Sequence, residues 1–238
     1  NEVKQSLGFV VQKVCNRHEL VRQNFTKCIR GYHLTNGSPI NETIWEDVNA
    51  TIFTHSEIEV YNQSNGSHIS GMDIACAWGN ISNKSAKYYN HKKQHIKISS
   101  YRLSSICNMK HCGVPTDFIK EINKRKNFNY YSILVRDEKD DSIDYDWLFI
   151  PANHPLLDPA SYHWVPTMGK TKKTSGQQLG WNTNVIKGCK MSITFSMSSQ
   201  LWLHIEMTEE LKKYIIASTR VLNKPKFDYI SLFQQLSV

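Results

Sequence analysis

The sequence predicts an α/β or α+β fold in which helices flank a mixed central β-sheet on both sides. Three observations predict this class. Segments with strand-like alternation are interspersed with segments of helical periodicity, hydrophobic residues make up 40% of the chain, and no heptad pattern is sustained. The length of 238 residues fits one domain, so we expect residues 1–238 to form a single domain.

The first half of the chain predicts one helix and a set of strands. Apolar residues recur at helical steps in Phe9–Gln23, and a short amphipathic piece surrounds Trp45. A short strand is expected at Ile58–Val60, a buried strand at Gly71–Trp78, a polar connection at Asn80–His91 and an alternating strand at Gln94–Leu103.

The second half predicts two helices and two strand pairs. Thr116 is a plausible N-cap for a helix over Asp117–Arg125, and Thr208 for a final helix over Glu209–Leu222. The strand pairs are expected at Tyr130–Val135 with Trp147–Ile150, and at Lys190–Met197 with Leu201–Ile205. The intervening residues 151–180 are expected to be irregular.

Several function classes are disfavoured by what the sequence lacks. It contains no P-loop, no dinucleotide fingerprint and no nucleophile elbow. No run of about 18 apolar residues is present and the N-terminus does not read as a secretion signal, so we expect a cytoplasmic protein with no membrane partner. An alternative, a secreted or viral glycoprotein domain, stays open because the first 85 residues contain eight glycosylation triplets, at Asn24, Asn36, Asn41, Asn49, Asn62, Asn65, Asn80 and Asn83.

The segments around Asp73 and Lys97 are the most informative for chemistry. An acid stands at the start of one predicted strand, and a lysine lies in the middle of the next predicted strand. If these strands are neighbours, the carboxylate could bind Mg²⁺, which accepts few protein ligands, while the ammonium holds a phosphate. A metal ion at this position could activate water for attack on a phosphodiester.

Here the sequence resembles the PD-(D/E)XK nucleases, in particular type II restriction endonucleases of the MspI-like four-base cutters. Gly71-Met72-Asp73-Ile74 matches the first acid, and His95-Ile96-Lys97 matches the D/E-x-K half, with His where the pattern has Asp or Glu. The resemblance implies that Asp73 and His95, or Gln94 in another register, hold the metal. It further implies that Lys97 acts at the scissile phosphate and that Glu19 is the helical acid of some members.

Basic and amide residues predict where DNA is bound. The chain has 29 Lys plus Arg against 21 Asp plus Glu, a formal net charge of +8, which favours polyanions. A recognition region is expected within residues 151–205, because amide side chains there can pair with base edges. The expected DNA-binding residues are Lys92, Lys93, Arg102, Lys170, Lys172, Lys173, Gln177, Gln178, Asn182 and Asn184.

The sequence therefore predicts a Mg²⁺-dependent deoxyribonuclease that cleaves double-stranded DNA at a short specific site, as a restriction system requires. Its catalytic residues are expected to be Asp73, His95, Lys97 and Glu19. A non-catalytic, basic nucleic-acid-binding module is the alternative. The sequence leaves both a monomer and a homodimer open.

Overall fold

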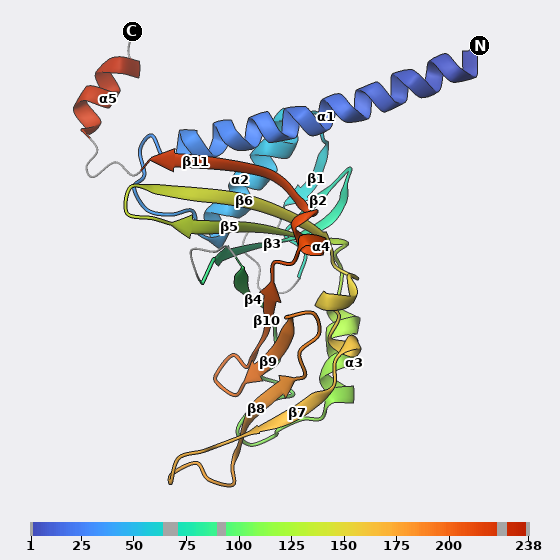
Figure 1. The fold of residues 1–238 in the computed structure, drawn as a ribbon, viewed down its shortest axis with the longest axis vertical. Coiled ribbons are helices and arrows are strands. Elements are labelled where there is room, and N and C mark those ends of the chain that lie inside the picture. Colours follow the sequence, from blue (N-terminus) through green and yellow to red (C-terminus); the bar gives the residue numbers. More distant parts are fainter. Residues whose placement is uncertain (1, 64–70, 90–93, 223–227, 237–238) are drawn as a thin grey trace.

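The computed structural model describes residues 2–63, 71–89, 94–222 and 228–236, and it has a mixed α/β architecture built on two sheets (Figure 1). The six-stranded sheet has the order β1-β2-β3-β5-β6-β11, and the five-stranded sheet has the order β4-β10-β9-β8-β7. In the six-stranded sheet only β3 and β5 run parallel, and every other neighbouring pair is antiparallel. The fold is compatible with the predicted α+β class.

The strands of the six-stranded sheet come from the first half, the middle and the C-terminal part of the chain. They are β1 (Val60–Gln63), β2 (Ile74–Cys76), β3 (Gly79–Lys87), β5 (Tyr130–Glu138), β6 (Ser142–Pro151) and β11 (Ile215–Leu222). The five-stranded sheet consists of β4 (His95–Arg102), β7 (Trp164–Met168), β8 (Gln178–Thr183), β9 (Lys190–Thr194) and β10 (Gln200–Glu206). The helices are α1 (Glu2–Tyr32), α2 (Glu42–His55), α3 (Pro115–Arg125), α4 (Glu209–Lys212) and α5 (Tyr229–Leu236), and two 3₁₀ turns are at Pro155–Leu157 and Pro159–Ser161.

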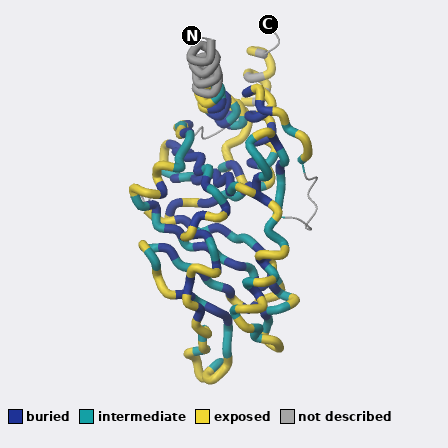
Figure 2. Tube along the Cα trace, turned by 90° about the vertical axis from the view of Figure 1, so that its right-hand side faces the viewer, coloured by how far each residue is buried: buried dark blue, intermediate teal, exposed yellow. Residues whose placement is uncertain are grey.

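The six-stranded sheet lies between two hydrophobic cores. On one face, Leu134, Tyr145 and Trp147 pack with residues of α1 and α2. On the other face, Ile133 and Leu148 pack with α3 and with the inner side of the five-stranded sheet. Alternate residues of β5 and β6 thus enter opposite cores, as the pleat of a strand requires. Figure 2 shows buried residues running through both sheets and exposed residues in the loop between β7 and β8.

Most of the predicted elements are present. The expected strands at Tyr130–Val135 and Trp147–Ile150 lie within β5 and β6, and the expected helix over Asp117–Arg125 lies within α3. Among the described residues, no helix is both long enough and apolar enough to cross a lipid bilayer.

Four predictions about local structure were wrong. Helix α3 begins at Pro115 behind the N-cap Val114, so Thr116 lies inside the helix and is not its N-cap. Residues 151–180 are not irregular throughout, because they contain β7 and the two 3₁₀ turns. The segment Asn80–His91 is not a connection, because most of it forms the central strand β3. The final helix over Glu209–Leu222 ends after one turn, at Lys212, and the chain then forms the edge strand β11, which pairs with β6 along its length. Ile215, Ile216 and Val221 are β-branched, and this favours the strand where a neighbouring backbone is available.

Candidate active site

Asp73 lies immediately before β2, at the point where the pairing of β2 with β3 stops. Its backbone N–H donates to the carbonyl of Ile81 at 2.8 Å, which continues the antiparallel ladder by one bond. The carboxylate Oδ2 then accepts a hydrogen bond from the backbone N–H of Asn83 at 2.5 Å. The side chain of Asp73 therefore occupies the position along the edge of β3 that a longer β2 would have filled.

Lys84 comes directly after Asn83 on β3 and brings a positive charge to the edge of this strand. Its Nζ donates to the carbonyl oxygen of Asn83 at 2.7 Å and to Oε1 of Glu42 at 2.9 Å. The side chain of Lys84 is only 13% exposed, whereas that of Glu42 is 40% exposed. The ammonium is thus held at β3 by a carboxylate that remains open to solvent, and its charge lowers the pKa of Asp73.

Glu46 adds a further carboxylate from the first turns of α2. Asn41 caps this helix by accepting a hydrogen bond from the N–H of Ile44, and Glu42 and Glu46 share one helix face because they are four residues apart. The pKa of Glu46 is raised to about 7, first by burial and then by the charges of Asp73 and Glu42, against the opposing charge of Lys84. The electrostatic coupling places Glu46 in the same cluster as Asp73.

The pKa of Asp73 is also raised, first by burial and then by the charge of Glu42. Lys84, the N–H of Asn83 and the hydroxyl of Ser82 act in the opposite direction. The cluster formed by Glu42, Glu46, Asp73 and Lys84 therefore carries three carboxyl groups and one ammonium. One positive charge does not neutralise three carboxylates, and this excess of negative charge favours a cation.

The donor set fits a hard divalent cation with few protein ligands. Within the described ranges, no group of three or more His, Cys, Asp or Glu side chains is arranged to hold a metal ion on its own. Mg²⁺ does not require such a cage, since it is usually held by one or two carboxylates and keeps several waters. Asp73 and Glu46 supply two such carboxylates, and the pKa of each is raised first of all by burial.

Lys97 does not lie on a strand next to Asp73. β2 is bordered by β1 and β3, whereas β4, which carries Lys97, belongs to the five-stranded sheet and pairs with β10. The prediction that these two segments are neighbouring strands was therefore wrong, because β3, read from the sequence as a connection, takes the place beside β2. The ammonium of Lys97 lies 4.2 Å from the ring centre of Trp202, and His95 is exposed opposite Glu206.

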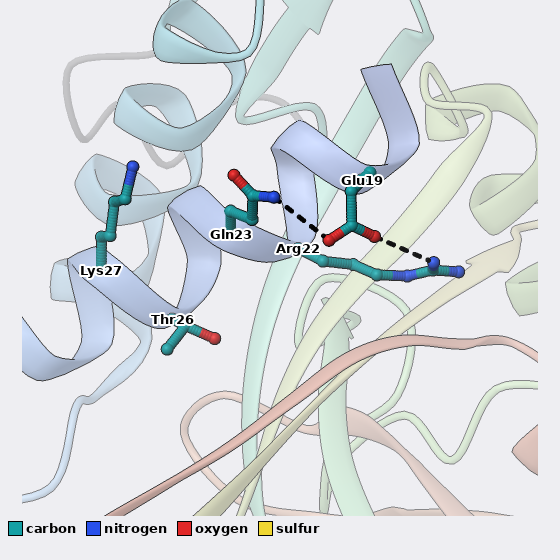
Figure 3. A pocket seen from close by; sticks show the side chains of 5 residues that line it. All are labelled: Glu19, Arg22, Gln23, Thr26 and Lys27. Atoms are coloured by element: carbon teal, nitrogen blue, oxygen red, sulfur yellow. Dashed lines mark hydrogen bonds and ion pairs between the residues drawn. The ribbon is translucent and has the colours of Figure 1, made fainter. Parts of the chain in front are cut away.

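Glu19 lies on the exposed side of α1. Figure 3 shows it in a shallow depression with Arg22, Gln23, Thr26 and Lys27, all from this one helix. Its carboxylate accepts a hydrogen bond from Gln23 at 3.2 Å and forms an ion pair with Arg22 at 3.7 Å. No interaction between Glu19 and Asp73 is present among the described residues.

The predicted DNA-binding residues are spread over the five-stranded sheet and its loops. Lys170, Lys172, Lys173 and Gln177 are exposed in the loop between β7 and β8, which Figure 1 shows at the end of the molecule farthest from α1. Arg102 is exposed at the end of β4, while Lys92 and Lys93 lie outside the described residues. The amides of this group have structural partners: Gln178 donates to the carbonyl of Gly180, Asn182 donates to Thr167, and Asn184 accepts from the N–H of His163.

Three of the glycosylation triplets start at a buried asparagine. Asn24 is 8% exposed, and Asn49 and Asn83 are fully buried. An attached glycan requires an accessible side-chain amide, so these three positions are not acceptors in the folded chain. They are the kind of chance triplet expected in a sequence rich in Asn and Ser.

The sequence reasoning assigned no catalytic or metal-binding role to four residues of this region: Lys84, Glu42, Glu46 and Ser82. The signal for Lys84 was present, because Ser82-Asn83-Lys84 has the same polar-x-Lys spacing as His95-Ile96-Lys97 and lies closer to Asp73. Glu42 and Glu46 could have been found as two acids four residues apart behind the N-cap Asn41. Comparison with known proteins gave no matching family model, no matching curated relative and no matching solved structure.

Proposed function

We propose that this chain is a Mg²⁺-dependent endonuclease that hydrolyses phosphodiester bonds of double-stranded DNA at a short specific site, as a type II restriction enzyme does. The observation that supports the proposal is the group at the edge of β3, where Asp73 accepts from the N–H of Asn83, Lys84 is paired with Glu42, and the charges of Asp73 and Lys84 both act on the pKa of Glu46. Asp73 precedes one strand and Lys84 lies in the next strand of the same sheet, which is the relation that the PD-(D/E)XK resemblance implies.

The motif is then completed by different residues from those expected at first. Ser82-Asn83-Lys84 takes the place of His95-Ile96-Lys97, and the acid missing at position 82 is supplied from α2 by Glu46. In this assignment Asp73 and Glu46 hold the metal ion. When bound, Mg²⁺ lowers the pKa of a coordinated water and neutralises charge on the phosphate.

Lys84 has the role of holding the scissile phosphate. Its ammonium acts electrostatically on Asp73 and is paired with Glu42, whose side chain is 40% exposed. An incoming phosphate oxygen can replace this carboxylate as the partner of Lys84, because hydrogen bonds from an ammonium to an ionised oxygen are strong in a partly buried site. The release of Glu42 restores a negative charge near the site and offsets part of the charge of the metal ion.

The test is cleavage of a defined plasmid with Mg²⁺, followed by sequencing of the fragment ends. Asp73→Asn, Glu46→Gln and Lys84→Met should each reduce the rate by at least about 100-fold, since each removes a charge that the reaction needs. Lys87→Met is the matched control, because Lys87 lies on the same strand and is also paired with a glutamate, Glu138, at 2.7 Å.

Discrete ends that share a short word support a restriction enzyme, and random ends would replace it by a non-specific nuclease. If the wild type binds DNA but leaves it uncut in Mg²⁺ and in Mn²⁺, the hydrolytic proposal fails and the non-catalytic binding module is the better description. Equal activity of Lys84→Met and Lys87→Met would remove the cluster at β3 from the mechanism.

A further inference from the structure

The five-stranded sheet has an outer face that the candidate active site does not use. Alternate residues of its central strands, among them Ile96, Leu203 and Met191, are buried in the core toward the six-stranded sheet. The residues between them point to the opposite side and are partly exposed. They include Lys97 on β4 and His204 on β10.

Lys97, His204 and Lys190 form one row across three adjacent strands, which we call the lysine row. His204 lies directly opposite Lys97 on β4 and directly opposite Lys190 on β9. Neighbouring strands are about 4.8 Å apart, so the two lysines flank the imidazole at a backbone separation of about 10 Å. A phosphate group is small enough to be reached by both ammonium groups from this spacing.

Positive charge in the lysine row is not balanced by acids. Among the described residues, neither Lys97 nor Lys190 forms an ion pair, and Lys97 instead places its ammonium over the ring of Trp202. By strand pairing, the nearest carboxylate is that of Glu206, which lies two residues farther along β10 than His204 and opposite His95. Lys97 and Lys190 lie on β4 and β9, on either side of β10, so their positive charges repel each other across the row, and an anion from outside the chain relieves this repulsion.

His204 lies between these two charges. Its pKa is lowered to about 4, first by burial and then by the charges of Lys97 and Lys190, so the imidazole is neutral at physiological pH. Its Nε2 lies 3.0 Å from the hydroxyl of Ser192. A neutral imidazole between two lysines, with the hydroxyl of Ser192 bonded to it, provides hydrogen-bonding groups suited to phosphate oxygens.

We propose that the lysine row binds the phosphate backbone of duplex DNA, as a contact separate from the cluster at the edge of β3. The identity of the polymer rests on the proposed function, while the presence of an anion site rests on the row itself. Because Lys97 covers the ring of Trp202, the contact is made to phosphates and not to stacked bases. It therefore contributes affinity that does not depend on the base sequence.

The test measures binding of a fluorescent duplex oligonucleotide by anisotropy, without Mg²⁺, at about 50 to 200 mM salt. Lys97→Gln combined with Lys190→Gln should weaken binding at least about 10-fold for any sequence and reduce the slope of log K against log salt by about 2. The matched control is Lys27→Gln combined with Lys120→Gln, which removes the same charge from exposed positions on α1 and α3. Lys97→Arg with Lys190→Arg should retain the affinity.

This experiment separates the two proposals. An unchanged affinity and salt slope in the Lys97→Gln, Lys190→Gln protein overturns the role of the lysine row, whether or not the wild type cleaves DNA. A weakened affinity with a wild-type cleavage rate at saturating DNA supports both proposals. A weakened affinity in a protein that never cleaves DNA supports the lysine row and refutes the nuclease. An equal loss in the control pair would show a general charge effect and would also overturn the proposal.

Discussion

Replacing His204 tests the electrostatics on the outer face of the five-stranded sheet through the stability of the protein, measured without any ligand. The folded protein holds the pKa of His204 at about 4, below its ordinary value of 6.5. Between these two pH values the imidazole of His204 is protonated in the unfolded chain but stays neutral in the folded chain. The free energy of unfolding therefore falls as the pH decreases from about 6.5 to about 4. His204→Gln removes this dependence.

The size of the effect follows from the pKa difference. Each unit is worth about 1.4 kcal/mol, which sets a ceiling of about 3 kcal/mol for complete protonation in the unfolded state. His204 is only partly buried and solvent screens its neighbours, so we expect about 1 kcal/mol. For a chain of this length, that corresponds to a difference in melting temperature of about 2 to 4 °C.

The assay is thermal unfolding of wild type and His204→Gln at about pH 7 and about pH 4.5. Relative to the wild type, His204→Gln should lose less stability on acidification, and so should the Lys97→Gln, Lys190→Gln protein, since both lysines lower the pKa of His204. The Lys27→Gln, Lys120→Gln protein should follow the wild type. Parallel acid profiles of wild type and His204→Gln would refute the reasoning.

Three further variants test the fold and the site. Glu46→Gln should raise the melting temperature at about pH 8.5 but not at about pH 4. The folded state raises the pKa of Glu46 to about 7, so ionisation of this carboxyl group destabilises the wild-type protein as the pH rises from 4.5 through 7. An equal effect of the substitution at both pH values would contradict this. Gly180→Ala should lower the free energy of unfolding in urea by more than about 2 kcal/mol, since the added Cβ would clash with a backbone carbonyl of β9. Gly31→Ala on α1 places its Cβ in open space and should be neutral or stabilising. Similar values for both variants would count against the β8–β9 register. Ser132→Ala should cost about 1 to 3 kcal/mol because the buried indole N–H of Trp147 loses its acceptor at 2.9 Å, and a neutral result in the same assay would show that another acceptor replaces it.

The sequence was sufficient to predict those elements whose side chains follow a clear period. Ile96 and Ile98 alternate with polar residues on β4, and both are buried as alternation predicts. α3 was predictable from its apolar positions and from the charges at its two ends. These elements need only local information, because one side of each faces a core and the other faces solvent.

β3 could not be recognised in the same way. Asn80, Ser82, Asn83 and Lys84 have low strand propensity, yet the strand is central because β5 and β2 pair with its backbone. Once β3 is read as a connection, the next lysine in a polar-x-Lys pattern is Lys97, which lies on β4 in the other sheet. Which strands become neighbours depends on packing between distant segments, and residue periodicity does not contain that information.

The hydrogen bond from the N–H of Asn83 to Asp73 has a consequence for protein handling as well as for chemistry. An unpaired strand edge is a template on which another chain can add a strand and begin to aggregate. The carboxylate of Asp73 satisfies one such backbone donor, and the charged Lys84 next to it disfavours an approaching strand. Asp73→Ala should therefore self-associate more readily than Asp73→Asn, whose side-chain oxygen can still accept this bond.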